Sequence, residues 1–196
     1  MTTLFADNFT RANSTGLGSN WAASPDAVST GFDIVSDAAI THNTANDSGN
    51  VVTAVTWPND QWAQVTLGVV NADGGFQGNG PCVRRSASAY TYYRLIVNAN
   101  NWEVNRVVAG AYTQIGTGTS GAATGDVWYL GVQGTTLTVK QNGSTVSSGT
   151  ITDSGISSGD AGIGYSSTDT TATLTGFAGG NFLTGGSSMS MMGVGT

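Results

Sequence analysis

DVWYLGVQGTTLTVKQNG, residues 126–143, is the stretch of this sequence that most directly indicates its fold. Large apolar residues alternate with other residues in it, as in a β-strand whose successive side chains point to opposite faces. These residues are Trp128, Leu130, Val132, Leu137 and Val139. The stretch ends in Asn142-Gly143, a strong hairpin signal because both positions tolerate positive φ. We therefore predict two strands and a tight turn here.

The same alternation recurs at short spacing along the chain. In residues 61–70 it places Ala63, Val65, Leu67 and Val69 on one face and Trp62, Gln64 and Thr66 on the other. In residues 92–97 it places Tyr93, Leu95 and Val97 opposite Tyr92, Arg94 and Ile96. The Gly-, Thr- and Ser-rich segment 116–125 is predicted to be an exposed loop. Helical periodicity and repeats of fixed period are lacking, so an all-β sandwich or barrel is expected.

The composition limits the classes of partner. The 196 residues suit one domain with a sizeable core, and only 9% are charged, against about 25% in ordinary soluble domains. A net charge of −6 with six basic residues argues against a nucleic-acid partner, and no apolar run is long enough for a membrane partner. The arginines nearest to a cluster are interpreted as solvated strand ends or local ion pairs. They are Arg84, Arg85, Arg94 and Arg106.

Several motifs resemble those of concanavalin A-like (laminin G-like) jelly-roll domains, such as occur in phage structural proteins and glycan-binding modules. They are Asp7-Asn8-Phe9-Thr10-Arg11-Ala12-Asn13, Leu17-Gly18-Ser19-Asn20-Trp21, the two strand segments within 126–143, and Gly159-Asp160-Ala161-Gly162-Ile163-Gly164. The resemblance covers about residues 4–178. It implies an antiparallel jelly-roll β-sandwich of the lectin/glucanase type, with one sheet curved to leave a concave side. We expect Phe9 and Trp21 to anchor the first crossing and Asp7 to pair with Arg11.

We divide the chain into a jelly-roll sandwich, residues 1–178, and a Gly-, Ser- and Met-rich C-terminal arm, residues 179–196. The arm has no strand alternation and needs a surface to lie against. Methionine is an adaptable contact residue. The arm is therefore predicted to contact a partner subunit, the alternative being that it packs back along its own domain. The predicted contacts are Met189, Met191, Met192 and Val194.

The inventory of chemically active side chains is nearly empty: one Glu (Glu103), one Lys (Lys140), one His (His42) and one Cys (Cys82). Sugar-cleaving members of the resembled superfamily carry paired carboxylates, in the glucanases as Glu-x-Asp-x-x-Glu, and Glu103 has no such neighbours. His42 is interpreted as a surface residue and Cys82 as a small buried hydrophobe. No catalytic residue and no cofactor is assigned. Structural calcium stays open because no Asp-rich loop specifies ligands, and Asp73-Gly74-Gly75 is interpreted as a turn.

Six side chains on the outward sides of the middle strands are candidates for binding a glycan. They are Trp62, Gln64, Tyr92, Arg94, Glu103 and Arg106. Aromatic rings and planar polar groups hold sugars in shallow sites. The same residue types are enriched at subunit contacts, and an Arg-Glu-Arg network can be purely structural. All three interpretations are kept here.

The function expected first is that of a non-enzymatic virion protein, a decoration or cement subunit on a bacteriophage capsid or tail. The N-terminus has no signal-peptide pattern, although the Thr-, Ser- and Gly-rich surface is typical of extracellular proteins. A virion protein made in the host cytoplasm reconciles the two, with capsid or tail proteins and further copies of itself as partners. The alternative is a carbohydrate-binding, lectin-like module with a cell-surface glycan as partner. A glycan hydrolase or lyase is the third hypothesis.

Overall fold

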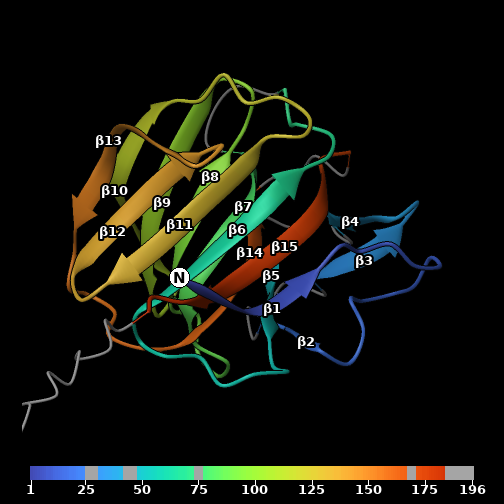
Figure 1. The fold of residues 1–196 in the computed structure, drawn as a ribbon, viewed down its shortest axis with the longest axis horizontal. Coiled ribbons are helices and arrows are strands. Elements are labelled where there is room, and N and C mark those ends of the chain that lie inside the picture. The colour runs from blue at the N-terminus through green and yellow to red at the C-terminus, as the bar shows by residue number, and fades with distance from the viewer. Residues whose placement is uncertain (25–30, 42–47, 73–76, 167–170, 184–196) are drawn as a thin grey trace, which may run out of the picture.

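The computed structural model describes residues 1–24, 31–41, 48–72, 77–166 and 171–183. Within these ranges the chain forms strands and no helix, so no segment among them is a helix able to cross a membrane. The strands form two antiparallel sheets that pack face to face (Figure 1). The all-β sandwich predicted from the sequence is confirmed.

The first sheet, sheet A, lies in front in Figure 1. Its order is β13 (Ser144–Thr152), β12 (Thr136–Gln141), β11 (Val127–Gln133), β6 (Gln61–Leu67), β15 (Thr173–Asn181), β4 (Ala38–Thr41) and β3 (Phe32–Val35), with β1 (Thr2–Asp7) also paired to β15. The second, sheet B, has the order β10 (Ala111–Thr119), β9 (Asn101–Val108), β8 (Tyr92–Val97), β7 (Gly78–Arg85), β14 (Asp160–Ser166), β5 (Ser48–Val52) and β2 (Trp21–Ala23). Neighbours such as β6 and β15, or β7 and β14, are far apart in sequence, so the chain passes repeatedly between the sheets.

The predicted inward residues build the core between the sheets. Trp128, Leu130 and Val132 of β11 are fully buried there, as are Leu137 and Val139 of β12. The β12–β13 hairpin turns at Asn142 (φ 51°) and Gly143 (φ 83°), both in the left-handed region as predicted. The inward set of β8 is likewise buried in the core.

The first crossing is anchored as expected. The side chains of Phe9 and Trp21 are buried, and the Trp21 ring packs edge-on against Phe177 at 5.0 Å between centroids. The Asp7 carboxylate accepts bonds from Arg11 Nη1 at 2.7 Å and from Trp21 Nε1 at 2.9 Å. The predicted Asp7–Arg11 pair therefore also fixes the position of a core tryptophan.

Three boundaries differ from the sequence prediction. Residues 116–119 belong to β10, although the segment was expected to be a loop, because its glycines leave room for core side chains. A Cβ on Gly118 would lie 2.6 Å from Trp102 Nε1, and one on Gly116 would overlap Ile151. Strand β6 ends at Leu67, so Val69 is 51% exposed and not part of the inward set. Strand β15 runs through Asn181, past the predicted domain boundary at residue 178.

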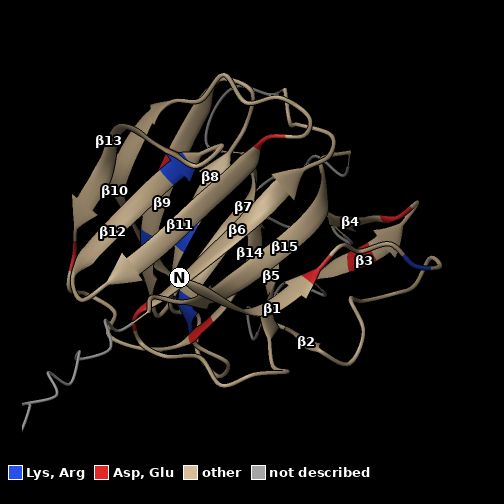
Figure 2. Ribbon diagram, in the orientation of Figure 1, with Lys and Arg blue, Asp and Glu red and all other residues tan. Residues whose placement is uncertain are grey.

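Three of the four clustered arginines are buried, which corrects their interpretation as solvated strand ends. Arg84, Arg85 and Arg94 are each at most 4% exposed. In Figure 2 the basic residues lie mostly on the body of the sandwich, and most acidic residues lie at strand ends and in loops. Two of the four form the expected local ion pairs: Arg84 Nη2 lies 3.5 Å from Asp60 Oδ1, and Arg106 Nη1 lies 2.8 Å from Asp153 Oδ2.

Arg84 joins three loops at one end of the sandwich. Its Nε donates to Asn59 O at 2.9 Å, its Nη1 to Ile156 O at 2.7 Å and its Nη2 to Gly134 O at 2.9 Å. Its own φ of 50° lies in the left-handed region, which interrupts the alternation at the end of β7. The next residue, Arg85, consequently contacts Tyr92 and Cys82 on the side of sheet B turned away from the core.

Replacing Arg84 with methionine should therefore destabilise the whole sandwich. The variant keeps much of the side-chain volume but leaves three carbonyl groups without their donor, and we expect a loss of about 3 kcal/mol in the free energy of unfolding. Urea denaturation measures this loss. Lys140→Met is the control: its ammonium lies over the Tyr129 ring, and its loss should cost about 1 kcal/mol or less. Equal losses in the two variants would contradict the role given to Arg84.

Candidate functional site

The strand register assembles a polar patch on the outer face of sheet B, the face turned away from sheet A. Side chains two residues apart on one strand share a face, and paired residues on neighbouring strands lie side by side. The register thus places three rows across this face. The rows are Tyr92–Val107–Tyr112, Arg94–Asn105–Gln114 and Ile96–Glu103, running from β8 to β9 and, in the first two, to β10.

A hollow of about 290 Å³ opens on these rows. Its lining consists of Arg94, Ile96, Glu103, Asn105, Tyr112, Gln114 and Ser166. Arg94, Glu103 and Asn105 are at most 6% exposed, whereas Gln114 and Tyr112 stand exposed at the rim. The hollow therefore has a fixed polar floor and an accessible edge.

The polar side chains of the hollow form one continuous hydrogen-bonded chain. Arg94 Nη2 donates to Asn105 Oδ1 at 3.2 Å, and Asn105 Nδ2 donates to Glu103 Oε1. Gln114 Nε2 donates to Glu103 Oε2 at 2.8 Å. A backbone group of β14 also fixes Arg94, because Arg94 Nη1 donates to the Tyr165 carbonyl at 3.0 Å. Each of these planar groups is thus held in one orientation.

The positive charges of Arg85 and Arg94 at the site lie close to aromatic rings and to one carboxylate, that of Glu103. The Arg94 guanidinium lies 5.3 Å from the centroid of the Tyr112 ring, and the Arg85 guanidinium lies 4.1 Å from that of Tyr92. Burial raises the pKa of the Tyr92 hydroxyl, which therefore stays protonated. Burial also raises the pKa of Glu103, although the hydrogen bond from Asn105, the Arg94 charge and the bond from Gln114 oppose this rise.

The structure divides the six candidate residues among three places. Tyr92, Arg94 and Glu103 lie together on the outer face of sheet B. Arg106, expected on the same outward side, points the other way because it is three residues after Glu103 on one strand. Its ion-pair partner Asp153 also accepts from the Tyr93 hydroxyl at 2.6 Å. This group closes the end of the sandwich.

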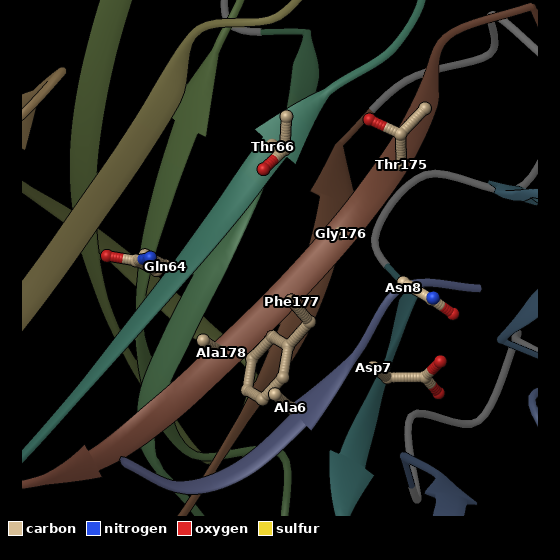
Figure 3. A pocket seen from close by; sticks show the side chains of 9 residues that line it. All are labelled: Ala6, Asp7, Asn8, Gln64, Thr66, Thr175, Gly176, Phe177 and Ala178. Atoms are coloured by element: carbon tan, nitrogen blue, oxygen red, sulfur yellow. The ribbon is translucent and has the colours of Figure 1, made fainter. Parts of the chain in front are cut away.

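Trp62 and Gln64 lie on the outer face of sheet A, on the opposite side of the molecule. The Trp62 ring stacks on Tyr129 at 5.9 Å and its Nε1 donates to Asn181 O at 3.2 Å. Trp62 and Tyr129 are both only 6% exposed, and the hollow of about 160 Å³ that they line is smaller than the hollow on sheet B. Beside them Gln64 borders an open trough of about 590 Å³ between β6, β15 and β1, shown in Figure 3. Its floor is formed by small residues such as Gly176 and Ala178, and no hydrogen-bonded network joins its described polar side chains.

Five of the seven residues that line the hollow were not among the sequence candidates: Ile96, Asn105, Tyr112, Gln114 and Ser166. Asn105 could have been found from its spacing of two residues from Glu103 on one strand. Tyr112 and Gln114 alternate in the first half of β10, whose second half was taken for a loop because of its glycines. The predicted tail contacts Met189, Met191, Met192 and Val194 lie outside the described residues, as do His42 and Asp73.

Metal-ligating side chains do not gather in the part of the chain that the structure describes, where no group of three or more His, Cys, Asp or Glu could hold an ion. Cys82 is buried and makes no disulfide. It packs with Tyr92 and Val107 in a small apolar cluster, so the prediction of a buried hydrophobe is confirmed.

Comparison with known proteins identifies the fold. Neither a family model nor a curated protein matches the sequence. Among solved structures, the carbohydrate binding module CBM66 from Bacillus subtilis is 14% identical with a TM-score of 0.63, covering 80% of this chain and 91% of that one. The exoplasmic/lumenal domain of VIP36 in its Ca²⁺/Man-bound form is 10% identical with a TM-score of 0.56, covering 84% of each chain. The GH43 protein BlXynB from Bacillus licheniformis is 11% identical with a TM-score of 0.59, but only 39% of its length is covered. The chain thus has the concanavalin A-like jelly-roll fold that its motifs predicted.

The raised pKa of Glu103 predicts a pH-dependent stability difference. Because the folded-state pKa lies above the ordinary value of 4.5, ionising Glu103 opposes folding, and this cost appears as the pH rises through the raised pKa. In the pH window between 4.5 and the raised pKa, the neutral variant Glu103→Gln should therefore gain stability relative to the wild type. Below pH 4.5 the stabilities of the two proteins should converge. Thermal unfolding on both sides of the window measures the difference.

Asp126 supplies a control of opposite sign. Its partial burial raises the pKa, but hydrogen bonds from Asn142, Ala123 and Gln141 outweigh this and lower it overall. Asp126→Asn should accordingly lose stability relative to the wild type as the pH rises through the Asp126 titration. If Glu103→Gln behaved like Asp126→Asn, the carboxylate of Glu103 would be a stabilising structural charge.

Proposed function

We propose that this protein is a non-catalytic carbohydrate-binding, lectin-like module whose sugar site is the hollow on the outer face of sheet B. The observation that carries the proposal is the hydrogen-bonded chain Arg94–Asn105–Glu103–Gln114 along a hollow with an exposed tyrosine at its rim. Binding sites for small molecules combine such convergent polar groups with apolar or aromatic walls.

A sugar suits this arrangement because each of its hydroxyl groups both donates and accepts hydrogen bonds. Glu103 supplies acceptor oxygens, whereas the second amide protons of Asn105 and Gln114 are donors. The Tyr112 ring, 42% exposed, offers an apolar wall for the C–H groups of a sugar ring. Because the floor side chains already hold one another in place, little of their conformational entropy is lost on binding.

Two of the structural neighbours support this proposal by what their names state. One is a carbohydrate binding module, and the other was solved in a Ca²⁺/Man-bound form. Their sequence identities of 14% and 10% do not transfer a ligand to this chain. They support the proposal because, in those two proteins, a domain of this fold binds a saccharide.

The absence of a second carboxylate supports a binding role over hydrolysis. Hydrolysis of a glycosidic bond ordinarily uses two carboxyl groups facing the bond from opposite sides. Glu103 is the only carboxylate among the described residues that line the hollow. The virion role and virion location stay predictions, and a lectin-like module displayed on a particle would be compatible with both.

The test is a glycan array followed by calorimetry with two matched glutamine variants. Gln114→Ala removes an exposed member of the proposed site, and we expect about a tenfold loss in affinity, equivalent to about 1.4 kcal/mol. Gln64→Ala removes a glutamine from an outward strand position on sheet A and should leave the affinity unchanged.

The reverse result, a loss with Gln64→Ala and none with Gln114→Ala, would place saccharide binding on sheet A and contradict the proposed site. An array on which the wild-type protein binds no glycan would contradict the proposed function itself.

A further inference from the structure

Three tyrosines form an aromatic patch directly beside the hollow. Tyr92 lies on β8, Tyr112 on β10 and Tyr90 in the segment before β8, and we call the three the tyrosine patch. The Tyr90 and Tyr92 rings are 5.6 Å apart between centroids, and those of Tyr90 and Tyr112 are 5.9 Å apart with an interplanar angle of 78°. Tyr112 belongs both to the patch and to the lining of the hollow, so the two are continuous.

The patch lies outside the main core. Tyr92 packs with Cys82 and Val107 in a separate cluster on the outer face of sheet B, and Tyr90 packs against that cluster. Tyr112 is 42% exposed and Tyr90 is half-buried. The patch therefore presents aromatic surface next to a polar hollow. Packing in the core of the sandwich does not explain why tyrosines occupy these positions.

The rings are held rigidly. The Tyr112 hydroxyl contacts both the Tyr90 hydroxyl and the Tyr92 hydroxyl, the latter at 3.2 Å. The turn after β9 supports Tyr90: Gly110 N donates to Tyr90 O at 2.9 Å, and a Cβ on Gly110 would lie 3.0 Å from the Tyr90 ring. A rigid aromatic surface costs little entropy when a ligand packs on it.

The size of the hollow limits what it can hold by itself. Its volume of about 290 Å³ lies just below the range for sites that enclose a small molecule, about 300–1,000 Å³. The tyrosine row and the polar row are separated by two residues along each strand, or about 7 Å. A ligand longer than one sugar unit that fills the hollow can therefore reach the tyrosine patch with its next unit.

We propose that the tyrosine patch is a second subsite, and that this protein binds an oligosaccharide with one unit in the hollow and the next against Tyr90 and Tyr112. This inference rests on the proposed function, because the hollow must bind a saccharide first. The polar row then fixes the first unit by hydrogen bonds, and the patch adds affinity for chain length through apolar contact. Tyr90 does not line the hollow, so a substitution of Tyr90 distinguishes the second subsite from the first experimentally.

Calorimetry with saccharides of increasing length tests the second subsite. The probes are glucose, mannose, xylose and fructose, each with its di-, tri- and tetrasaccharide. In at least one series the wild-type protein should bind the disaccharide or a longer member about tenfold more tightly than the monosaccharide, which corresponds to about 1.4 kcal/mol. Tyr90→Ala should abolish this gain and leave the monosaccharide affinity unchanged, whereas Tyr90→Phe, which keeps the ring, should retain it.

The failure of this inference can be told apart from failure of the proposed function. Equal affinities for monosaccharide and tetrasaccharide, both weakened by Gln114→Ala, would overturn the second subsite and leave the hollow as a sugar site. A Tyr90→Ala variant that weakens the monosaccharide as much as the longer chains would also overturn it. No binding in any series would overturn both. Should Tyr90→Ala not fold, the chain-length dependence of the wild type and of Tyr90→Phe decides.

Discussion

Everything proposed for this protein depends on the two-residue alternation of β8 and β9. On one side of these strands Leu95 and Val104 pack into the core, while the other side carries Arg94, Glu103 and Asn105. The buried side fixes the register, because a shift by one residue would drive the charged groups into the core. The same register then brings the polar groups into hydrogen-bonding distance. Core packing therefore positions the candidate site.

Retaining a buried carboxylate and a buried guanidinium on one sheet face is costly. Burial raises the pKa of Glu103, and apolar residues of similar size could cover the same strands. The network offsets part of this cost with hydrogen bonds: two amides donate to Glu103, and Arg94 donates to a carbonyl and to an amide oxygen. The proposed binding role would give these groups a reason to occupy a face that needs no charge for folding.

Much of the fold could be predicted from local patterns, whereas most of the residues that line the hollow could not. Alternation and the Asn142-Gly143 turn are local signals, so the strands and the fold class followed from them. Glycines misled in β10, where they make room for Trp102. Predicting the site residues requires both the alternation along each strand and the order of the strands in the sheets. Arg106 lies an odd number of residues from Glu103 on one strand and therefore faces inward. Trp62 lies on the other sheet, which no local pattern reveals.

The most direct test of the central claim is an NMR titration of the ¹⁵N-labelled protein with the saccharide of strongest array response. The side-chain amides of Asn105 and Gln114 report on the outer face of sheet B, and that of Gln64 reports on sheet A. The account predicts that the amide resonances of Asn105 and Gln114 shift in a saturable manner while that of Gln64 stays in place. Saturable shifts at Gln64, with Asn105 and Gln114 unmoved, would contradict it.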